Sequence, residues 1–347
     1  MSAASAMTAE TTLMAREAAE APAAVAILLA ANDMALRRIA ARLRANPPTG
    51  VVTCARGSSD HAATYAKYLV ETRIGAPTAS AALSVASLYD APVAAGNRLC
   101  IVISQSGRSP DLLRAVERQR QSGAFVVALV NQDDAPVCAL ADEVIALSAG
   151  QERSVAATKS YICSLAAIAA LVARWSEDAA MLSAVEALPA LLADASRLDW
   201  SPAIDQLRDA ANLFVIGRGY GLAVAQEAAL KFKETCALHA ECFSAAEVKH
   251  GPMAIVQPGF HILAFGGGDQ AGADVRATAD MFRARGAKVL LADPSAGHEV
   301  LPMIAAHPAI EPIAAIQSFY PMANALAVAR GCDPDAPPHL EKVTRTV

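Results

Sequence analysis

The order strand, short turn, helix in the first half of this chain returns in the second half, and this duplication limits the folds that the chain can adopt. In the first half, VVTCARGSSDHAATYAKYLVE (residues 51–71) reads as a strand, a turn with glycine and a helix. In the second half, NLFVIGRGYGLAVAQEAALKFKE (residues 212–234) repeats that order. Strands that alternate with amphipathic helices are typical of parallel βαβ units. We therefore predict an α/β chain with two tandem domains, each a doubly wound, mostly parallel sheet flanked by helices.

The rest of the pattern predicts where elements and domains begin and end. The expected strands are residues 51–55, 99–104, 125–131, 143–147, 213–216, 260–266 and 288–292. The expected helices are residues 61–71, 110–119, 221–236, 272–285 and 316–330, with a further helical stretch over 13–45 that Pro22 interrupts. These boundaries give an N-terminal helical segment (1–45), a first domain (46–175), a second domain (200–330) and a C-terminal tail (331–347).

The composition argues against several classes of partner. The chain has 347 residues, enough for two domains with substantial cores, and a net charge of −5 with no dense block of Lys and Arg. We therefore expect neither nucleic acid nor a membrane as the main partner. The longest apolar run, residues 162–173, is too short to span a bilayer. The N-terminus lacks the basic and apolar regions of a secretion signal, so we expect a cytoplasmic protein.

The seven cysteines and seven histidines are scattered along the sequence. Since they form neither a CxxC motif nor a regular disulfide framework, the cysteines read as reduced thiols. No cluster of His, Cys and Asp has the spacing of metal ligands. We therefore predict no metal and no cofactor.

Charged residues fall on two separate faces of the first helix predicted for the second domain. On a helical wheel of about 100° per residue, Lys231 and Glu234 lie beside Glu227, whereas Gln226 and Lys233 occupy another sector. A surface helix needs one polar stripe, so one of the two should line an enclosed space. From spacing alone, a surface ion pair between Glu227 and Lys231 is the more common explanation. The alternative is a carboxylate base, a lysine and a histidine gathered for proton transfer on a small substrate.

A second short helix is expected after this one. Ser244 and Glu247 form a capping box at its start, and the glycine and proline at 251–252 end it. Lys249 and His250 therefore lie on its last turn, where the helix dipole favours positive charge. His250 is the histidine that the proton-transfer hypothesis would use.

The loop SQSGRS, from Ser104 to Ser109, is the strongest candidate for an anion site. It follows a predicted strand and precedes a helix, with Ser109 at the N-cap and Pro110 at the first helical position. Ligands bind at the carboxyl ends of strands in open α/β sheets, and hydroxyls beside exposed N–H groups at a helix start suit a phosphate. The alternative is a polar turn in which Ser109 only caps the helix. Arg108 could either add charge to the site or point to solvent.

Two other polar turns are weaker candidates of the same kind. Gly57-Ser58-Ser59 follows the first predicted strand, and SVAATKS (154–160) opens the helix after the strand that ends at Leu147. Neither would indicate a site without the loop at 104–109.

Several motifs, taken in order, resemble one known family. They are ISQSG (103–107), VAATK (155–159), GRG with EAALKFKE (217–234), HAE (239–241), EVKHGP (247–252), VARG (328–331) and the tail's Leu340 and Lys342. From about Leu13 to its end the chain resembles the isomerase half of glucosamine-6-phosphate synthase (glutamine–fructose-6-phosphate aminotransferase), which is built from two sugar isomerase (SIS) domains. The resemblance implies two tandem SIS domains with a flavodoxin-like three-layer sandwich.

The resemblance also implies which residues hold the substrate, a phosphorylated amino sugar or ketose. The sugar phosphate would be held by Ser104, Gln105, Ser106 and Ser109. The residues expected to contact the sugar are Ser58, Ser59, Val155, Ala157 and Thr158.

Four residues would be catalytic by the same resemblance. Glu234 would be the base that moves a proton between C1 and C2, and a carboxylate suits this because it can reach both carbons. Lys231 would position the sugar. His250 would open the ring and, in the family, reaches the partner subunit's site, which implies a homodimer. Lys342, from a tail that closes the active site, would form a Schiff base with the ketose or, in the direction of ammonia release, act as an electrostatic or orienting group.

The chain also departs from the synthases. Arg56 stands in place of their usual cysteine, Ser109-Pro110 in place of threonine-alanine, and Ala157 in place of a serine that contacts substrate. The sequence before Leu13 leaves no room for a glutaminase domain, so we expect that glutamine is not the nitrogen donor. ARGSSD, SQSGRSPD and KVTRTV resemble the glutaminase-free, SIS-type glucosamine-6-phosphate deaminases more closely.

The expected reaction is therefore conversion of glucosamine 6-phosphate to fructose 6-phosphate and ammonia. A first alternative is a related enzyme: an isomerising aminotransferase that takes ammonia directly, or a deglycase or deaminase for galactosamine or fructosamine phosphates. A second is a non-catalytic module that senses phosphosugars. Such a module has no reason to keep Glu234, His250 and Lys342, so this alternative is disfavoured.

Overall fold

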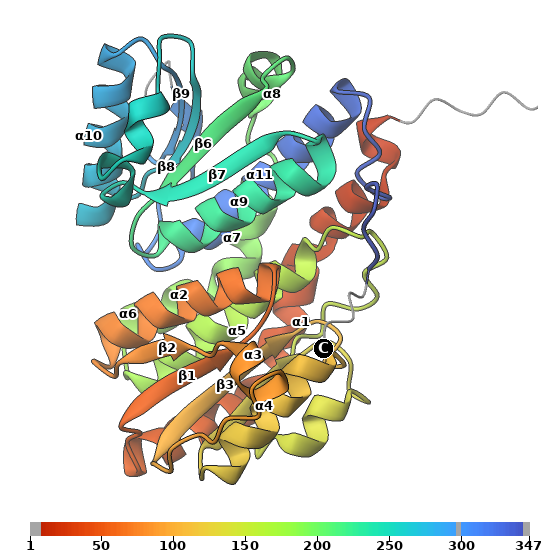
Figure 1. Ribbon diagram of the computed structural model, residues 1–347, viewed down its shortest axis with the longest axis vertical. Coiled ribbons are helices and arrows are strands. Elements are labelled where there is room, and N and C mark those ends of the chain that lie inside the picture. Colours follow the sequence, from red (N-terminus) through yellow and green to blue (C-terminus); the bar gives the residue numbers. More distant parts are fainter. Residues whose placement is uncertain (1–7, 296–299, 343–347) are drawn as a thin grey trace, which may run out of the picture. The chain divides into compact units, whose positions relative to one another are not determined.

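The computed structural model describes residues 8–295 and 300–342, and the chain forms two compact units (Figure 1). Residues 22–151 and 160–189 make up one of them, called here the first-sheet unit. The other, the second-sheet unit, combines the N-terminal stretch up to Ala21 with residues 152–159 and 190–342. Each unit contains one five-stranded sheet in which every strand pair is parallel.

The first sheet has the strand order β2-β1-β3-β4-β5. Its strands are β1 (Gly50–Cys54), β2 (Thr78–Ser80), β3 (Arg98–Ser104), β4 (Phe125–Val130) and β5 (Glu143–Ala146). All six residues of β4 are buried, as expected for an inner strand covered on both faces. The edge strands β2 and β5 are shorter.

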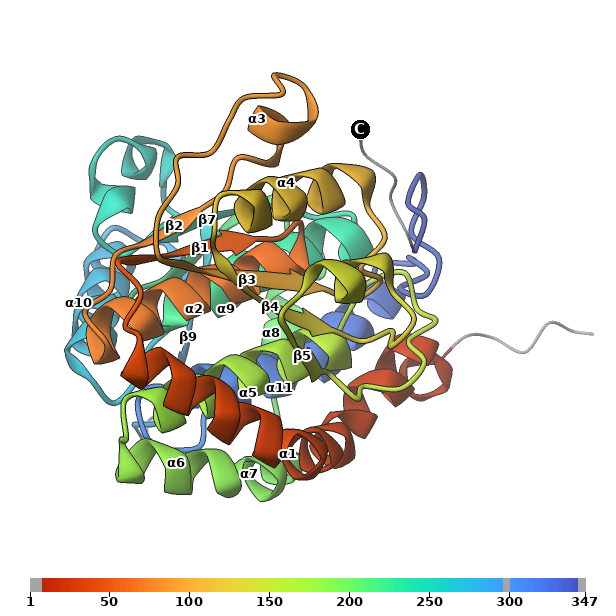
Figure 2. The ribbon, with the colours of Figure 1, turned by 90° about the horizontal axis from the view of Figure 1, so that it is seen from below.

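Helices cover both faces of the first sheet (Figure 2). They are α2 (Ser58–Arg73), α3 (Leu83–Ser87), α4 (Pro110–Gln121), α5 (Lys159–Trp175), α6 (Ala179–Glu186) and most of α1 (Leu13–Ala45). Leu112 and Val116 of α4 pack with Val102 and Ala128 in one buried cluster. The amphipathic face of α4 therefore holds the loop before it against the carboxyl ends of β3 and β4.

The second sheet has the order β10-β9-β8-β6-β7. Its strands are β6 (Asn212–Gly217), β7 (His239–Ser244), β8 (His261–Phe265), β9 (Lys288–Asp293) and β10 (Val300–Pro302). Its helices are α7 (Leu188–Ala195), α8 (Ser201–Leu207), α9 (Gly221–Cys236), α10 (Gln270–Ala284) and α11 (Glu311–Ala329). In Figure 1, α10 lies on one face of this sheet and α9 and α11 lie on the other.

Aromatic packing fixes α9 and α11 under the second sheet. The ring of Phe319 on α11 lies 5.1 Å from that of Phe232 on α9, in an edge-to-face arrangement, and 6.4 Å from that of Phe265 on β8. All three side chains are buried. This packing fixes the position of α9, and with it the position of its charged side chains, relative to the second sheet.

The α/β prediction of two doubly wound parallel sheets is confirmed, but three edge strands were not predicted. The strands β2, β7 and β10 were not expected from the sequence. At β7 the chain leaves α9 through Ala237, whose φ of 47° ends the helix, and then pairs with β6. The short helix expected after Ser244 is only a 3-10 turn, Glu247–Lys249, although the Ser244 hydroxyl does accept the Glu247 N–H at 3.2 Å.

The helices α1 and α11 also differ from the prediction. The first helix, α1, continues through Pro22 without interruption. The last, α11, begins at Glu311, five residues before the expected start, with Pro312 in its first turn, where proline needs no N–H partner.

Helix α1 is the one helix among the described residues that is long and apolar enough to cross a membrane, judged by length and composition. Its apolar face lies in the protein: Val25, Leu28, Leu36 and Ile39 have no exposed surface. The buried Asn32 side chain also donates to the carbonyl of Ala146 at 2.9 Å and accepts its N–H at 3.0 Å. These contacts are those of a core helix that protects the edge strand β5.

Candidate functional site

Helix α9 buries one of its two polar stripes. The side chains of Glu227 and Lys231 are 0% and 1% exposed, whereas Lys233 on the other stripe is exposed. The prediction that one stripe is enclosed is therefore confirmed, and the surface-pair explanation for Glu227 and Lys231 is wrong. Sequence spacing could not distinguish the two, because i,i+4 pairs have the same geometry on buried and exposed faces.

Lys231 lies between two carboxylates. Its Nζ is 2.5 Å from Oε2 of Glu234 and 3.3 Å from Oε1 of Glu227. On the far side, the hydroxyl of Tyr320 on α11 donates to Oε1 of Glu227 at 3.5 Å. Burial acts to lower the pKa of Lys231, but the two carboxylates outweigh it and the pKa is raised above its ordinary value. Lys231 is therefore a fixed ammonium group.

Glu234 is the accessible end of this network. Its side chain is 22% exposed, in contrast to the fully buried Glu227. A carboxylate held by one ammonium group and open on its other side can accept a proton from a bound substrate. The ammonium of Lys231, in turn, can stabilise negative charge that develops beside it.

His250 ends the 3-10 turn after β7 and is exposed. Its backbone N–H donates to the carbonyl of Glu247 at 2.9 Å. None of the contacts described for Glu234 involves His250. Within the second-sheet unit, the structure therefore assembles Glu227, Lys231 and Glu234 and leaves the His250 side chain open to solvent.

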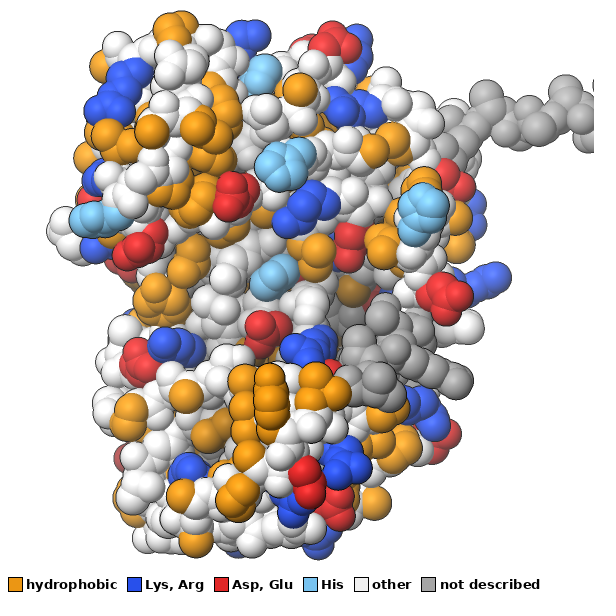
Figure 3. Space-filling model, viewed as in Figure 1, with side chains coloured by type: hydrophobic (Ala, Val, Ile, Leu, Met, Phe, Trp, Pro, Cys, Tyr) orange, Lys and Arg blue, Asp and Glu red, His pale blue; other side chains and the backbone are white. Residues whose placement is uncertain are grey.

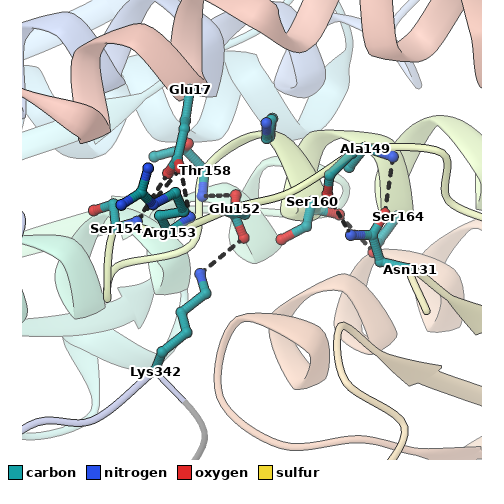
Figure 4. Close-up of polar contacts among 12 residues, drawn as sticks. Glu17, Asn131, Ala149, Glu152, Arg153, Ser154, Thr158, Ser160, Ser164 and Lys342 are labelled. Atoms are coloured by element: carbon teal, nitrogen blue, oxygen red, sulfur yellow. Dashed lines mark hydrogen bonds and ion pairs between the residues drawn. The ribbon is translucent and has the colours of Figure 1, made fainter. Parts of the chain in front are cut away.

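The loop at residues 152–159 and the C-terminal tail meet at Glu152, which the sequence analysis did not single out. Its fully buried carboxylate accepts the Thr158 N–H at 3.0 Å and lies 3.1 Å from Nζ of Lys342 (Figure 4). Lys342 thus has a specific buried partner. Nothing local signalled this pair, because 190 residues separate the two positions.

Other contacts fasten the same loop and tail. The carboxylate of Glu17 on α1 accepts the N–H groups of Arg153 and Ser154, and burial raises the pKa of Glu17 above its ordinary value. The carboxylate of Asp335 accepts two N–H groups at the start of α1, and its carbonyl accepts the Val155 N–H at 3.3 Å. The tail from 335 to 342 is therefore joined at both ends to this loop.

The loop also carries hydroxyl groups without a protein partner. The Ser154 and Thr158 side-chain oxygens are buried and make no hydrogen bond within the described structure. Val155 and Ala157 between them are half-buried. Buried hydroxyls usually find a partner, so this loop has unused hydrogen-bonding capacity next to Lys342.

In the first-sheet unit, the loop between β3 and α4 is shaped around Gly107. The Gly107 N–H donates to the hydroxyl of Ser104 at 2.9 Å, and φ at Gly107 is +62°. A Cβ here would lie 2.7 Å from side-chain atoms of Ala135 and Val137, so only glycine fits. The loop therefore has a defined turn ahead of the α4 N-terminus.

The polar side chains of this loop are half-buried or exposed. Ser109 is at the N-cap of α4 as predicted, but its side chain makes no capping hydrogen bond. Ser104, Gln105 and Ser106 are half-buried, as Ser109 is. Arg108 is exposed and pairs with Asp134 at 2.8 Å. Of the two alternatives that the sequence left open, Arg108 therefore points to solvent and does not add its charge to the loop.

The neighbouring turn between β1 and α2 supplies a different cation. Arg56 donates to the buried carboxylate of Asp111, in the first turn of α4, at 2.9 Å. Ser58 and Ser59 form the first turn of α2 and are half-buried. An acid at a helix N-terminus would compete with a bound anion, and Arg56 neutralises that acid. Arg56 is a second residue whose partner the sequence did not reveal.

The expected site residues thus divide between the units. The second-sheet unit holds Lys231, Glu234, His250, Val155, Ala157, Thr158 and Lys342, and the first-sheet unit holds Ser58, Ser59, Ser104, Gln105, Ser106 and Ser109. Over residues 8–295 and 300–342, no three His, Cys, Asp or Glu side chains gather as metal ligands would. On the face seen in Figure 3, basic, acidic and apolar side chains are interspersed.

Comparison with known proteins places this geometry in context. The sequence profile of the SIS domain matches residues 48–174 and 206–299. A glutamine–fructose-6-phosphate aminotransferase (isomerizing) from Aeropyrum pernix is 33% identical over 309 residues, which cover 82% of this chain and 49% of that protein. This chain spans about half the length of the curated relatives it matches.

Solved structures agree with the sequence match. One is a protein from Silicibacter pomeroyi DSS-3 that is described as a phosphosugar isomerase without a demonstrated activity. It has a TM-score of 0.89 and 44% identity, and the match covers 93% of this chain and all of that one. Another is the C-terminal domain of glucosamine-fructose-6-phosphate aminotransferase from Francisella tularensis. It has a TM-score of 0.84 and 25% identity, with 94% and 98% of the two chains covered.

Proposed function

The chain belongs to the SIS domain family, and we propose that it converts glucosamine 6-phosphate to fructose 6-phosphate and ammonia. The observation that carries this proposal is the buried Glu227–Lys231–Glu234 network on α9, with its one accessible carboxylate. A solvated surface helix has no need of such an arrangement. Proton transfer between two adjacent carbons of a sugar needs one base beside a fixed positive charge.

In this proposal the loop from Ser104 to Ser109 binds the phosphate. The Ser109 hydroxyl makes no capping hydrogen bond, and the loop precedes the N-terminus of a twelve-residue helix. Ser58 and Ser59 at the start of α2, together with the residues from Val155 to Thr158, contact the sugar. The unused hydroxyl of Thr158 supports this part of the proposal.

The chemical step moves two protons. Glu234 removes the proton from C2 of the open-chain amino sugar and returns it to C1. O1 gains a proton and the amino nitrogen gives one up, so that the C1 aldehyde becomes an alcohol and C2 becomes an imine. Water then adds to the imine carbon, and the C–N bond breaks to release ammonia and leave the C2 ketone. Lys231 stabilises the negative charge that develops on O1 during the transfer.

His250 and Lys342 have supporting roles in this scheme. His250 assists ring opening, and its exposed position is compatible with action at the site of a partner subunit in a homodimer. Lys342 provides an amine for the ketose or orients it, from a tail that closes the site. The proposed location is the cytoplasm.

The proposal is tested by hydrogen exchange at carbon. The purified protein in D₂O should incorporate deuterium at C1 of fructose 6-phosphate formed from glucosamine 6-phosphate. Glu234→Gln should lose turnover and this exchange while phosphosugar binding persists, because the amide keeps the shape of the side chain but cannot take a proton. Exchange at the wild-type rate in Glu234→Gln would remove Glu234 from the mechanism. Glu241→Gln, at an exposed position of β7, is the matched control.

A further inference from the structure

The two sheets correspond strand by strand, so each loop of one unit has a counterpart in the other. From one edge to the other, the first sheet has the strand order β2-β1-β3-β4-β5, and the second has the order β7-β6-β8-β9-β10. The strand β8 thus takes the place of β3, with β6 and β9 as neighbours where β3 has β1 and β4. The loop that follows β8 and precedes α10 is therefore the counterpart of the loop from Ser104 to Ser109.

This counterpart loop, residues 266–269, consists of three glycines and Asp269 and already holds an anion. The Gly268 N–H donates to Oε2 of Glu311 at 2.7 Å, and the Ala306 N–H donates to Oε1 of the same carboxylate at 3.3 Å. Glu311 belongs to the first turn of α11 and is 3% exposed. Its carboxylate thus lies where the helix α10 begins, a position that favours negative charge.

The glycines of the loop allow this close approach. A Cβ at Gly267 would lie 3.3 Å from Oε2 of Glu311, and a Cβ at Gly268 would lie 3.0 Å from Oε1. Side chains at these two positions would require the carboxylate to shift by a few tenths of an ångström. In the first-sheet unit, by contrast, the corresponding positions carry serine and glutamine side chains. The Gly107 N–H there donates to the Ser104 hydroxyl, and the described carboxylate contact of that loop is the one between the exposed Arg108 side chain and Asp134.

Little space remains beside Glu311. In the hollow lined by Arg218, Tyr220, Asp269 and Glu311, the volume open to the centre of a water-sized sphere is about 10 Å³. That volume holds about one water molecule and excludes a phosphate group. The position is therefore filled by the protein itself.

We propose that the carboxylate of Glu311 takes the place of a phosphate at the loop 266–269 of the second-sheet unit. Each chain would then carry one phosphate site instead of two. This inference rests on the proposed function only for the first loop, which is taken to bind the phosphate. A carboxylate and a phosphate make the same hydrogen bonds to backbone N–H groups, and a tethered group competes at a high effective concentration. Both halves of the chain thus have the same fold, but only the first half binds phosphate.

The test is the number of inorganic phosphate ions bound per chain, measured by isothermal titration calorimetry and equilibrium dialysis. The wild-type protein should bind one. Glu311→Ala removes the carboxylate and vacates the cradle, so it should bind one more than the wild type. Glu311→Gln is the matched control: it keeps the side-chain volume and one acceptor for Gly268, and its stoichiometry should remain that of the wild type.

Two results would overturn the inference. One is a wild-type protein that binds a second phosphate which Ser104→Ala/Ser106→Ala does not remove. The other is a Glu311→Ala protein with native circular dichroism that gains no phosphate. If the wild type binds none and Glu311→Ala binds one, the first loop fails as a phosphate site, while the inference about Glu311 stands.

A measurement on the wild type covers the case in which Glu311→Ala does not fold. In a phosphate titration followed by ¹⁵N–¹H NMR, the amide of Gly107 in the first loop should shift. The amide of Gly268 should not, since Glu311 already occupies it. A saturable shift at Gly268 would contradict the inference.

Discussion

Glu227 and Lys231 expose almost no side-chain surface, so their charges must be balanced inside the protein. Removing two ions from water costs several kcal/mol each, and only close partners offset that cost. Here one ammonium group serves two carboxylates, and the hydroxyl of Tyr320 adds a hydrogen bond to Glu227. A buried charge cluster often contributes no more stability than apolar side chains of the same volume would. Its presence on α9 therefore supports the proposed catalytic role.

Removal of Lys231 should strongly destabilise the fold. In Lys231→Met the carboxylate of Glu227 stays buried without its cation, so the free energy of unfolding should fall by about 3–5 kcal/mol in urea denaturation. The exposed Lys233→Met on the same helix should change it by less than about 0.5 kcal/mol. Equal effects of the two substitutions would show that the buried network contributes no more than a surface charge.

At the tail, Glu152 should anchor Lys342. A hydrogen bond to a charged group contributes about 1.5–3 kcal/mol, so Glu152→Gln should weaken docking and speed trypsin cleavage after Lys342 by roughly 10- to 100-fold. Mass spectrometry of the released peptide measures the rate. Glu341→Gln, which changes an exposed neighbour in the tail, should leave it unchanged. Identical cleavage of the wild type and Glu152→Gln would mean that the ion pair does not hold the tail.

At the scale of elements, the inner strands and the edge strand β5 were predictable, whereas the edge strands β2, β7 and β10 were not. The strands β1, β3, β4, β6 and β8 are apolar runs followed by a turn and a helix, which is the pattern that identifies parallel strands. The strands β2 and β10 have three residues each, too few to show a period. The strand β7 was missed because its burial pattern is that of a partly exposed edge, and HAECFS has no strong β-branched signal.

The pairing of β8 with β9 has a consequence for pH dependence. It places His261 next to Lys288 in register, and burial, with the charge of Lys288, lowers the pKa of His261. The unfolded chain then binds a proton more readily than the folded one below about pH 6.5, so stability should fall as the pH falls through that range.

This effect is measurable by urea denaturation. Between about pH 7.5 and about pH 5.5, the wild type should lose more stability than His261→Gln does, because the variant has no proton to gain there. The exposed His239→Gln should behave like the wild type. A wild type and a His261→Gln variant with the same pH profile would show that His261 is not responsible.

At the scale of the whole molecule, the repeated strand–turn–helix order sufficed to predict two sheets, but it could not predict how the two copies diverged. The loop at 104–109 was visible in the sequence because its three serines lie within six residues. The partners of Lys342, Arg56 and Gly268 were not, since Glu152, Asp111 and Glu311 lie far from them along the chain. Pairs of this kind are set by tertiary packing, and one sequence carries no signal for them.

The central claim is that this SIS chain removes ammonia from an amino sugar phosphate. The most direct test is ammonia release by the purified protein from glucosamine 6-phosphate without glutamine, with galactosamine 6-phosphate in parallel. We predict that ammonia and fructose 6-phosphate form in equal amounts from the gluco substrate. Phosphosugar binding without ammonia from either substrate would contradict the claim and leave a deglycase or a sensor.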